Sequence, residues 1–511
     1  MVFPVRVFAT KVFPGRLICR QSVNMMRKVP LIVILGSTGT GKTKLSVELA
    51  QKFGGDVISA DSMQVYADLD IVTAKATKEE QQTVPHHLLD VAKPSEPFTV
   101  KHFRNLAGPI IDDLLSASKY PIVVGGTNYY IESLLWDILV SPPTSVTSSA
   151  SSKMVKDSLK SRSGSSSPEM MQREDDRDGD SSTPSDEISD LELETMSPKE
   201  LHDRLRQVDP ISAGRLHPNN KRKILRALEV YQETGIPISE FIKEQRSQPG
   251  GNRLGGPLRY PHTILLWLRC NQEVLNERLD KRVDSMLHNG LLPEVRNFYE
   301  TYVKSQSANQ YTKGILQSIG FKEFVPYLEK FGADQDTIID NFLQNIEYKL
   351  PKEPIASEPE GLDLLRKCLD ELKLVTRRYS KKQIKWIQNR FLGSHDRQVP
   401  PLYSLDTSDV SQWMANVYSP AVDIIESYIN ERQPKTTPME SVQHPGSGLN
   451  EEVLNFCEIC KRHFVGEFQW KLHLASNKHK RAKDGLRKRV KRLGGGTIGG
   501  RGDVDGSSAK K

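Results

Sequence analysis

The stretch Leu31-Ile-Val-Ile-Leu-Gly36-Ser-Thr-Gly-Thr-Gly41-Lys42-Thr43 decides the fold of this chain. Five apolar residues precede G-x-x-x-x-G-K-T, and a helical pattern follows to residue 52, an order typical of a phosphate-binding P-loop. The glycines let successive backbone N–H groups point at phosphate oxygens, and the helix N-terminus adds favourable partial charge. Lys42 would reach the terminal phosphate and Thr43 would hold Mg2+. We therefore predict a phosphate site made of Gly36, Ser37, Thr38, Gly39, Thr40, Gly41, Lys42 and Thr43.

Outside the P-loop, short apolar strands alternate with helical patterns. Strands are expected at 56–59, 120–124 and 263–268. Helices are expected at 198–207, 219–231, 272–289, 293–304, 312–330 and 361–390. This alternation predicts an α/β fold in which helices cover both faces of a parallel sheet. We predict a P-loop sheet core that is split by a helical insertion domain, with a small zinc finger at the C-terminal end.

Length, charge and cysteine content narrow the class of protein. The 511 residues are enough for two or three folded units at roughly 100–200 residues each. Lys and Arg number 71 against 64 Asp and Glu, a net charge of +7 that is unevenly placed, since the first acidic residue is Glu48 and residues 478–492 are strongly basic. Five cysteines do not make a disulfide framework, which excludes a secreted scaffold. The apolar runs at 31–35 and 264–268 are far shorter than the roughly 18 residues of a membrane span, so no membrane association is expected.

The two ends and the middle of the chain differ in composition from the core. Residues 1–28 are basic and acid-free, as in a mitochondrial targeting peptide, although a merely basic, disordered terminus is the alternative. Initiation at Met25 or Met26 would remove this segment, so we expect location in both mitochondrion and cytoplasm, with the nucleus as a further option. Residues 140–196 are rich in Ser, Thr, Pro and mixed charge, which predicts a disordered insertion.

These features give a predicted domain plan. Its segments are a targeting segment (1–28), the first part of the core (29–139), a disordered insertion (140–196), a helical insertion (197–258), the second part of the core with basic helices (259–392), a linker (393–450), a small C-terminal module (451–484) and a basic Gly-rich tail (485–511).

A P-loop does not by itself say what is done with the phosphate. An ATP-dependent kinase would place an acidic residue after a later apolar strand, but the strand at 121–124 is followed by Gly125-Gly126-Thr127. The strand at 56–59 leads instead to Asp61. Because the carboxyl ends of parallel strands face the ligand crevice, Asp61 and Thr127 are expected to project toward the P-loop.

A second motif lies near the C-terminal end: Cys457-x2-Cys460-x12-His473-x5-His479. Two Cys and two His at this spacing predict a tetrahedral Zn2+ site, without which so small a module would not fold. The five-residue gap between the histidines resembles matrin-type fingers, which are associated with RNA. The basic continuation from 478 to 492 is either an RNA tether or a nuclear import signal.

From residue 31 to about 390, the chain resembles the tRNA dimethylallyltransferases, also called tRNA isopentenyltransferases, of the eukaryotic type with a C-terminal matrin-like finger. The resemblance rests on ordered motifs: the P-loop, Asp61-Ser-Met-Gln-Val-Tyr66, Thr73-Ala74-Lys75, Pro85-His-His-Leu-Leu-Asp90, Gly125-Gly126-Thr127, His217-Pro-Asn-Asn-Lys-Arg-Lys-Ile-Leu-Arg226, Glu277-Arg-Leu-Asp-Lys-Arg282-Val-Asp-Ser-Met286, Ile319-Gly320-Phe321 and Thr376-Arg-Arg-Tyr-Ser-Lys-Lys-Gln-Ile-Lys-Trp386.

This resemblance implies transfer of the dimethylallyl group of dimethylallyl diphosphate to N6 of the adenine at tRNA position 37, with release of diphosphate. The P-loop and its Mg2+ would hold the diphosphate, and Arg282 would stabilise the charge that builds on it. Asp61 would take the proton of the amine, with Thr127 beside the reacting centre. The pocket for the base, which must be flipped out of its stack, would be lined by Ser62, Met63 and Gln64. Tyr66, Tyr129 and Tyr130 would either stack on the base or belong to the core.

Two basic segments would supply phosphate contacts to tRNA: Arg222, Lys223 and Arg226 on one, and Arg377, Arg378, Lys381 and Lys382 on the other. We expect a monomer. Three alternatives stay open at this point: an isopentenyltransferase for free adenine nucleotides, a P-loop kinase, and a zinc-finger RNA-binding protein with an inactive core.

Overall fold

The computed structural model describes residues 29–139, 193, 195–304, 314–348, 350, 357–393, 396–442 and 449–493. The predicted targeting segment, nearly all of the predicted disordered insertion and the end of the tail lie outside these ranges. Within them, every helix is too short or too polar to cross a membrane.

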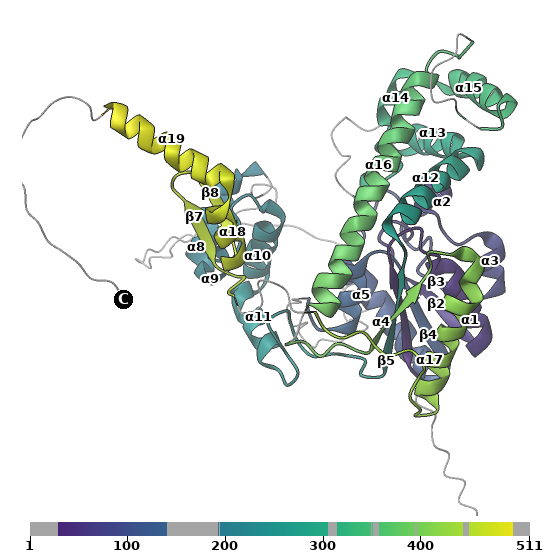
Figure 1. Ribbon diagram of the computed structural model, residues 1–511, viewed down its shortest axis with the longest axis horizontal. Helices are drawn as coiled ribbons and strands as arrows, with labels where there is room; N and C mark the ends of the chain where they lie inside the picture. Colours follow the sequence, from purple (N-terminus) through teal and green to yellow (C-terminus); the bar gives the residue numbers. More distant parts are fainter. Residues whose placement is uncertain are drawn as a thin grey trace, which may run out of the picture.

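A six-stranded parallel sheet forms the centre of the described core (Figure 1). Its strands are β1 (Leu31–Gly36), β2 (Gly55–Ser59), β3 (His86–His87), β4 (Tyr120–Val124), β5 (Thr263–Arg269) and β6 (Leu402–Asp406). The spatial order is β3-β2-β4-β1-β5-β6, so β1 lies between β4 and β5 with Ile32 in register with both Ile122 and Ile264. The predicted α/β fold with a parallel sheet is confirmed.

The two faces of β1 are buried against different helices, which explains why the strand is apolar throughout. Leu31, Val33 and Leu35 face the layer made by α4 (Val100–Ser116) and α5 (Asn128–Leu135). Ile32 and Ile34 face α1 (Lys42–Phe53) and α17 (Ser419–Ile429) on the other side. Alternating side chains thus fill two separate cores.

A second helical cluster stands on the carboxyl side of the sheet. Its helices are α12 (Gln272–His288), α13 (Leu291–Tyr302), α14 (Val325–Lys330), α15 (Ala333–Asn345) and α16 (Leu362–Ile387), with the short α2 (Asp70–Thr73) against them, while α3 (Lys78–Thr83) precedes β3. Helix α16 runs from this cluster down to the sheet (Figure 1), and its predicted apolar stripe, which includes Leu365, Leu369 and Leu372, is buried.

The single helix expected over residues 312–330 is correct only for residues 325–330 of its described part. Residues Gly314–Gln317 form a single 3-10 turn, and α14 begins only at Val325. Gly320 has a φ of 106°, a backbone conformation that a right-handed helix does not contain.

The helical insertion predicted between the two parts of the core is present. It consists of α8 (Pro198–Val208), α9 (Pro210–Ala213), α10 (Lys221–Thr234) and α11 (Ile238–Ser247), with a small core of its own that includes Leu201, Leu205 and Ile224. The chain leaves the core after residue 137 and returns to it at residue 257. These two segments, 135–137 and 257–259, are hydrogen-bonded to each other and are called the neck here. Asp137 N donates to Pro257 O at 3.2 Å, and Arg259 N donates to Leu135 O at 2.7 Å.

The linker predicted for residues 393–450 is wrong where the chain is described. Strand β6 pairs in parallel with β5, and α17 packs its apolar stripe (Ala421, Ile424, Ile425) on the sheet. The strand is an edge strand of only five residues, and the Pro, Ser and Asp residues around it give the composition of a linker.

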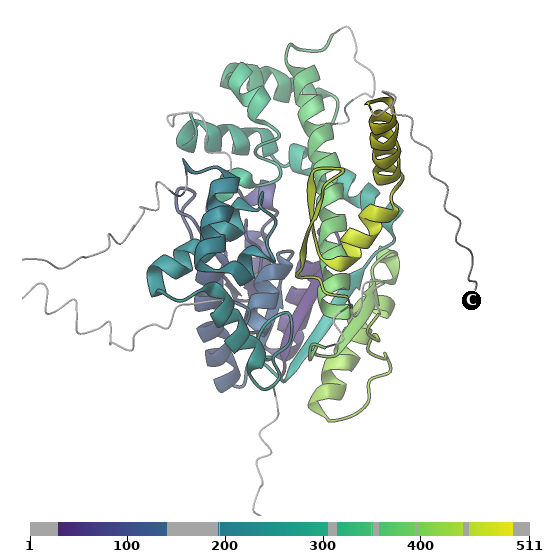
Figure 2. The same cartoon turned by 90° about the vertical axis from the view of Figure 1, so that its left-hand side faces the viewer.

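The zinc-finger segment folds as a hairpin, β7 (Leu454–Cys457) and β8 (Arg462–Val465), followed by α18 (Glu467–Ala475) and α19 (Asn477–Leu493). It docks on the helical insertion, since Leu454 N donates to Gly214 O at 3.0 Å and Glu452 pairs with Arg215 and Arg246. Figure 1 shows the finger and the insertion together on one side of the molecule, and this side faces the viewer in Figure 2. The finger is thus held on the insertion, not suspended from the core.

Candidate active site

A cavity of about 440 Å3 opens at the carboxyl ends of the central strands. Parallel α/β sheets place their ligand crevices at this edge. The lining brings together the P-loop, the segment after β2, helix α12 and helix α16; it includes Thr38, Gly39, Gly41, Lys42, Thr43, Asp61, Ser62, Met63, Gln64, Arg282, Thr376, Tyr379 and Gln383. Most of the residues predicted for diphosphate and base therefore share one cavity.

The P-loop has the backbone shape of an anion cradle. Gly39 and Gly41 have φ values of 83° and 85°, which favour glycine, and Gly41 is the N-cap of α1. A Cβ on Gly36 would lie 2.7 Å from Thr40 Oγ1 and 3.0 Å from Leu268 O, so β1 and the loop fit only around a glycine. The N-terminus of α1 consequently faces the cavity without a capping side chain, as anion binding requires.

Two half-buried cations, Lys42 and Arg282, and one carboxylate, Asp61, share this cavity. Lys42 Nζ donates to Ser37 O at 2.8 Å, and burial lowers the pKa of this ammonium to about 8, with nearby Arg282 lowering it further and Asp61 opposing the shift. Burial also lowers the pKa of Arg282, again opposed by Asp61. Positive charge here is poorly solvated and only partly balanced, so an anionic ligand is favoured.

Asp61 follows β2 and lines the cavity, whereas Thr127 follows β4 and contacts the neighbouring Ser62 without lining the cavity itself. Asp61 Oδ1 accepts a hydrogen bond from Met63 N at 3.0 Å, which fixes the carboxylate. Thr127 Oγ1 accepts from Ser62 N at 2.9 Å and donates to Ser62 Oγ at 3.1 Å. Thr127 therefore positions the turn that carries Asp61, and its direct part in chemistry stays a prediction.

Two residues of α16 were not predicted as site residues. Gln383 Oε1 accepts from Thr38 N at 2.9 Å, and its Nε2 donates to Gly126 O at 3.0 Å, which ties the P-loop to the loop after β4. The Tyr379 hydroxyl is hydrogen-bonded to Thr127 and Gln383, and burial and the charge of Asp61 raise the pKa of this phenol, so it stays protonated. Leu372, Thr376, Tyr379 and Gln383 all line the cavity at helical spacing, a signal hidden in the sequence by the basic residues between them.

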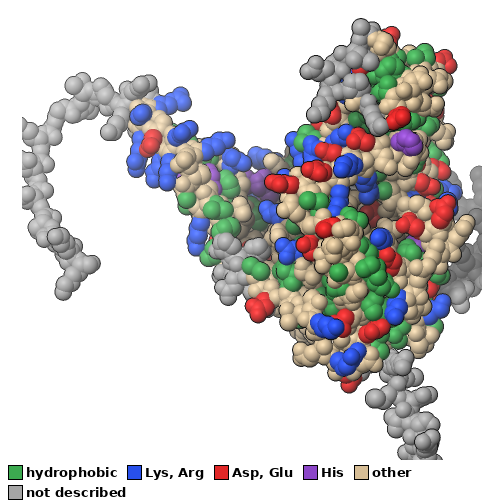
Figure 3. All heavy atoms as spheres, turned by 45° about the vertical axis from the view of Figure 1, so that its right-hand side comes forward, with side chains coloured by type: hydrophobic (Ala, Val, Ile, Leu, Met, Phe, Trp, Pro, Cys, Tyr) green, Lys and Arg blue, Asp and Glu red, His purple; other side chains and the backbone are tan. Residues whose placement is uncertain are grey.

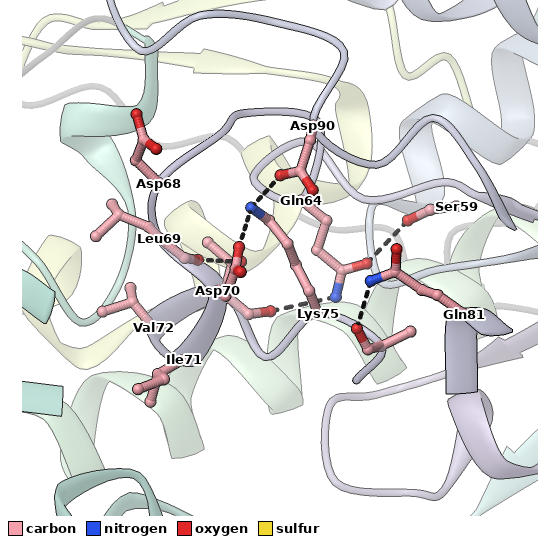
Figure 4. A network of polar contacts seen from close by, with 12 residues as sticks. Ser59, Gln64, Asp68, Leu69, Asp70, Ile71, Val72, Lys75, Gln81 and Asp90 are labelled. Atoms are coloured by element: carbon pink, nitrogen blue, oxygen red, sulfur yellow. Dashed lines mark hydrogen bonds and ion pairs between the residues drawn. The ribbon is translucent and has the colours of Figure 1, made fainter. Parts of the chain in front are cut away.

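Gln64 shapes the wall of the cavity (Figure 4). Its Nε2 donates to Thr73 O at 3.2 Å and Ala74 O at 3.1 Å, and its Oε1 accepts from Ser59 Oγ at 2.9 Å. Both amide hydrogens are thus used within the protein, which leaves only acceptor capacity on Oε1 for a base.

The same wall is braced by Lys75, whose side chain is 2% exposed. Its ammonium lies 2.6 Å from Asp70 Oδ1 and 2.5 Å from Asp90 Oδ1 (Figure 4). From α13, Glu294 accepts hydrogen bonds from Ile71 N and Val72 N at the start of α2. The cavity wall is therefore held by its own polar network before any ligand binds.

Of the three tyrosines considered for stacking, two belong to the core. Tyr66 is buried and its hydroxyl accepts from Phe98 N at 2.9 Å, and Tyr130 stacks on Phe103 with ring centroids 4.5 Å apart. Tyr129 is exposed and lies edge-on to Trp386.

The two predicted basic segments lie on α10 and α16. The exposed members are Arg222, Lys223, Arg378, Lys381 and Lys382. Arg226 pairs with Glu229 at 3.1 Å, and Arg377 pairs with Asp280. Contact of these residues with tRNA stays a prediction.

The four predicted finger ligands converge. The ligand atoms of Cys457, Cys460, His473 and His479 all lie within 4.8 Å of one another. Each thiol sulfur is 3.5 Å from His479 Nδ1, which is 3.1 Å from His473 Nε2. A tetrahedron with Zn–N near 2.0 Å and Zn–S near 2.3 Å has edges of about 3.3–3.8 Å, so this donor set fits zinc.

Comparisons with known proteins agree with this geometry. A family model described as "IPP transferase" matches residues 64–390, one described as "Isopentenyl transferase" matches 29–93, and one described as "Zinc-finger double-stranded RNA-binding" matches 455–480. The chain is 41% identical over 459 residues to a tRNA dimethylallyltransferase of Mus musculus, covering 89% of this chain and 86% of that one. It is 32% identical over 475 residues to the corresponding protein of Saccharomyces cerevisiae, covering 90% and 92%.

A solved structure described as a eukaryotic dimethylallyltransferase acting on tRNA is similar with a TM-score of 0.65 and 29% identity. The similarity covers 91% of this chain and 99% of the other. It therefore extends over both parts of the core and the insertion between them.

Proposed function

The chain belongs to the IPP transferase family of tRNA dimethylallyltransferases, and from this premise we propose that it transfers a dimethylallyl group from dimethylallyl diphosphate to N6 of the adenine at tRNA position 37. The observation that carries this proposal is the cavity itself. It joins a P-loop with Lys42 and Arg282 to a fixed carboxylate, Asp61, at the end of the neighbouring strand.

The P-loop side of the cavity would bind the diphosphate of the donor. As the C1–O bond of the dimethylallyl group breaks, its electron pair leaves with the diphosphate. Lys42, Arg282 and the first residues of α1 line the cavity, where they would stabilise that negative charge, which is how preorganised sites lower a barrier. The Thr43 hydroxyl lines the cavity and is a hard oxygen suited to Mg2+, which would neutralise diphosphate charge when bound.

The Asp61 side would receive the flipped adenine. The lone pair of N6 is delocalised into the purine, so the amine becomes nucleophilic only as it loses a proton. Asp61 would take that proton while the N6–C1 bond forms. Thr127 and Tyr379 hold the surroundings of the carboxylate through Ser62 and Gln383.

A tRNA acceptor is favoured over a free nucleotide by the parts outside the cavity. The insertion carries exposed Arg222 and Lys223, and α16 carries exposed Arg378, Lys381 and Lys382. Along α19, Lys and Arg gather on one arm of the molecule (Figure 3), where Asp484 is the single acidic residue of the helix. Basic surfaces of this extent can contact many phosphates of a nucleic-acid backbone, whereas a free nucleotide would contact only a small part of them.

The test is a product assay with four acceptors. The full chain is incubated with dimethylallyl diphosphate and a tRNA transcript that carries adenine at position 37, the same tRNA with guanine there, AMP, or ADP. We expect N6-isopentenyladenosine, found by mass spectrometry after nuclease digestion, only with the first acceptor. Product from AMP or ADP at a comparable rate would identify a nucleotide-specific enzyme. Phosphate transfer to AMP in a parallel reaction with ATP in place of the prenyl donor would identify a kinase.

The finger is proposed to bind Zn2+ through Cys457, Cys460, His473 and His479 and to raise the affinity for tRNA. Cys457→Ala should remove the bound metal and unfold the finger. We expect a raised KM for tRNA, a shallower salt dependence of binding because fewer Lys and Arg engage phosphates, and a nearly unaltered kcat at saturating tRNA.

The matched control is Cys270→Ala, which changes a cysteine outside the metal cluster. It should keep the zinc content and the salt slope. A Cys457→Ala variant whose kcat collapses at saturating tRNA, with its core still folded, would show that the finger helps to build the active complex.

We further propose that residues 1–28 direct the protein to mitochondria, while chains that begin at Met25 or Met26 stay in the cytoplasm and, through the basic run at 478–492, enter the nucleus. Removing residues 1–23 should abolish mitochondrial import and spare activity in solution, since β1 begins only at Leu31. Import of the truncated, tagged chain would locate the signal elsewhere.

A further inference from the structure

A tryptophan that follows the edge strand β6 packs directly against the P-loop. Trp413 is 6% exposed, and a Cβ built on Gly41 would lie 2.9 Å from two atoms of its six-membered ring. The indole Nε1 donates to Glu48 Oε2 at 2.8 Å. Lys44 Nζ lies 4.6 Å from the ring centroid, within the range of a cation–π contact.

These three partners mark out one face of α1. Gly41, Lys44 and Glu48 are separated by three and four residues, so they follow one another along the first turns of the helix. Trp413 packs against this face, and its ring is held there by three contacts: with Gly41, with the ammonium of Lys44 and with the carboxylate of Glu48. Turning the ring away would leave a buried N–H unpaired and would remove the apolar contact with Gly41.

The P-loop therefore has the cavity on one side and the ring of Trp413 on the other. Its open side is the cavity, where Lys42 and Thr43 face Asp61 and Arg282. On its other side the indole lies against the Cβ side of Gly41, so that no methyl group fits between the glycine and the ring. A diphosphate that carries a short alkyl chain can place the chain in the cavity, whereas a phosphate chain that continues past Gly41 along α1 meets the indole.

We propose that Trp413 closes the outer end of the phosphate cradle and thereby selects a diphosphate ester over a nucleoside triphosphate. The proposal rests on the proposed function, because it assumes that the cradle holds the donor's diphosphate. It would give a physical reason for a chain with a complete Walker A sequence to discriminate against ATP. Trp413 acts here as a specificity-determining residue, since it touches the cradle and not the reacting atoms.

The experiment measures the binding of three probes to the full chain at fixed Mg2+: inorganic diphosphate, inorganic triphosphate and ATP. Calorimetry or competition gives the ratio of the Kd for ATP to the Kd for diphosphate. We expect the unsubstituted protein to prefer diphosphate clearly. Trp413→Ala should lower the ratio for ATP, and that for triphosphate, by on the order of 10- to 100-fold, the range that steric exclusion supplies. Trp413→Phe should keep most of the selection because a ring still covers Gly41.

The control for lost packing is Ile425→Ala, which removes a buried side chain from the same apolar cluster. It should lower the melting temperature and leave the binding ratios unchanged. Trp413→Leu leaves a smaller cavity than alanine does but has no ring to cover Gly41, so it reports on selection if the alanine variant does not fold.

Two results would overturn the proposal: equal affinity of the unsubstituted protein for ATP and diphosphate, or unchanged ratios in folded Trp413→Ala and Trp413→Leu. In the second case Trp413 would be core packing only. Prenylation of tRNA is assayed in parallel, so a failure of the proposed function shows as missing product and is separate from a failure of selection.

Discussion

Replacing Asp61 by asparagine is expected to reduce the rate of prenyl transfer by about 10²–10⁴-fold at saturating tRNA and donor. The amide keeps the shape of the carboxylate and can still accept the hydrogen bond from Met63 N, but it cannot take the proton of N6. The affinity for tRNA should change little, because the lost interaction develops only in the transition state. Single-turnover product formation and filter binding measure the two quantities separately.

The control is Asp284→Asn, which changes an acidic residue of α12 that pairs with Lys373 outside the cavity. It should keep the rate of transfer. Near-normal turnover of Asp61→Asn would show that another group, or water, accepts the proton.

Lys42→Met should lower both the affinity for diphosphate and the rate of transfer, the rate by about 10²–10³-fold, as expected when one preorganised donor to a developing anion is lost. Methionine has nearly the same length, so the cavity keeps its shape while the charge is removed. Because burial lowers the pKa of Lys42 to about 8, its ammonium is costly to keep charged in the empty cavity and gains most when an anion arrives.

Diphosphate competition and kcat/KM for the donor check this expectation. Lys52→Met, at the exposed C-terminal end of the same helix, is the matched control and should behave like the unsubstituted protein. Donor affinity retained in Lys42→Met would argue against the P-loop as the diphosphate site.

The sequence was sufficient to predict those parts of the site that follow local rules. A P-loop needs only adjacent residues, and the rule that ligands bind at the carboxyl ends of parallel strands was enough to bring Asp61 and Thr127 near it. Arg282 was placed by resemblance and lies in the cavity.

The remaining features depend on contacts between distant segments. Gln383 reaches Thr38 across 345 residues, and nothing in its own surroundings in the sequence indicates that contact. Trp413 lies in a stretch whose composition suggests a linker, because a short edge strand needs few apolar residues. The number of basic residues around Arg377 predicts an exposed basic face on the helix. It does not reveal that Arg377 pairs with Asp280, which lies on another helix.

The neck between the core and the insertion has a mechanical consequence. The chain leaves the core at Asp137 and returns to it at Pro257, and these two residues are hydrogen-bonded to each other. The finger is bound to the insertion through the ion pairs of Glu452 with Arg215 and Arg246. The insertion and the finger are thus joined to each other, and the insertion meets the core where its two chain connections lie side by side. The contacts at the neck therefore set the distance between α19 and Asp61, and this distance would limit which lengths and bends of a nucleic acid could touch both at once.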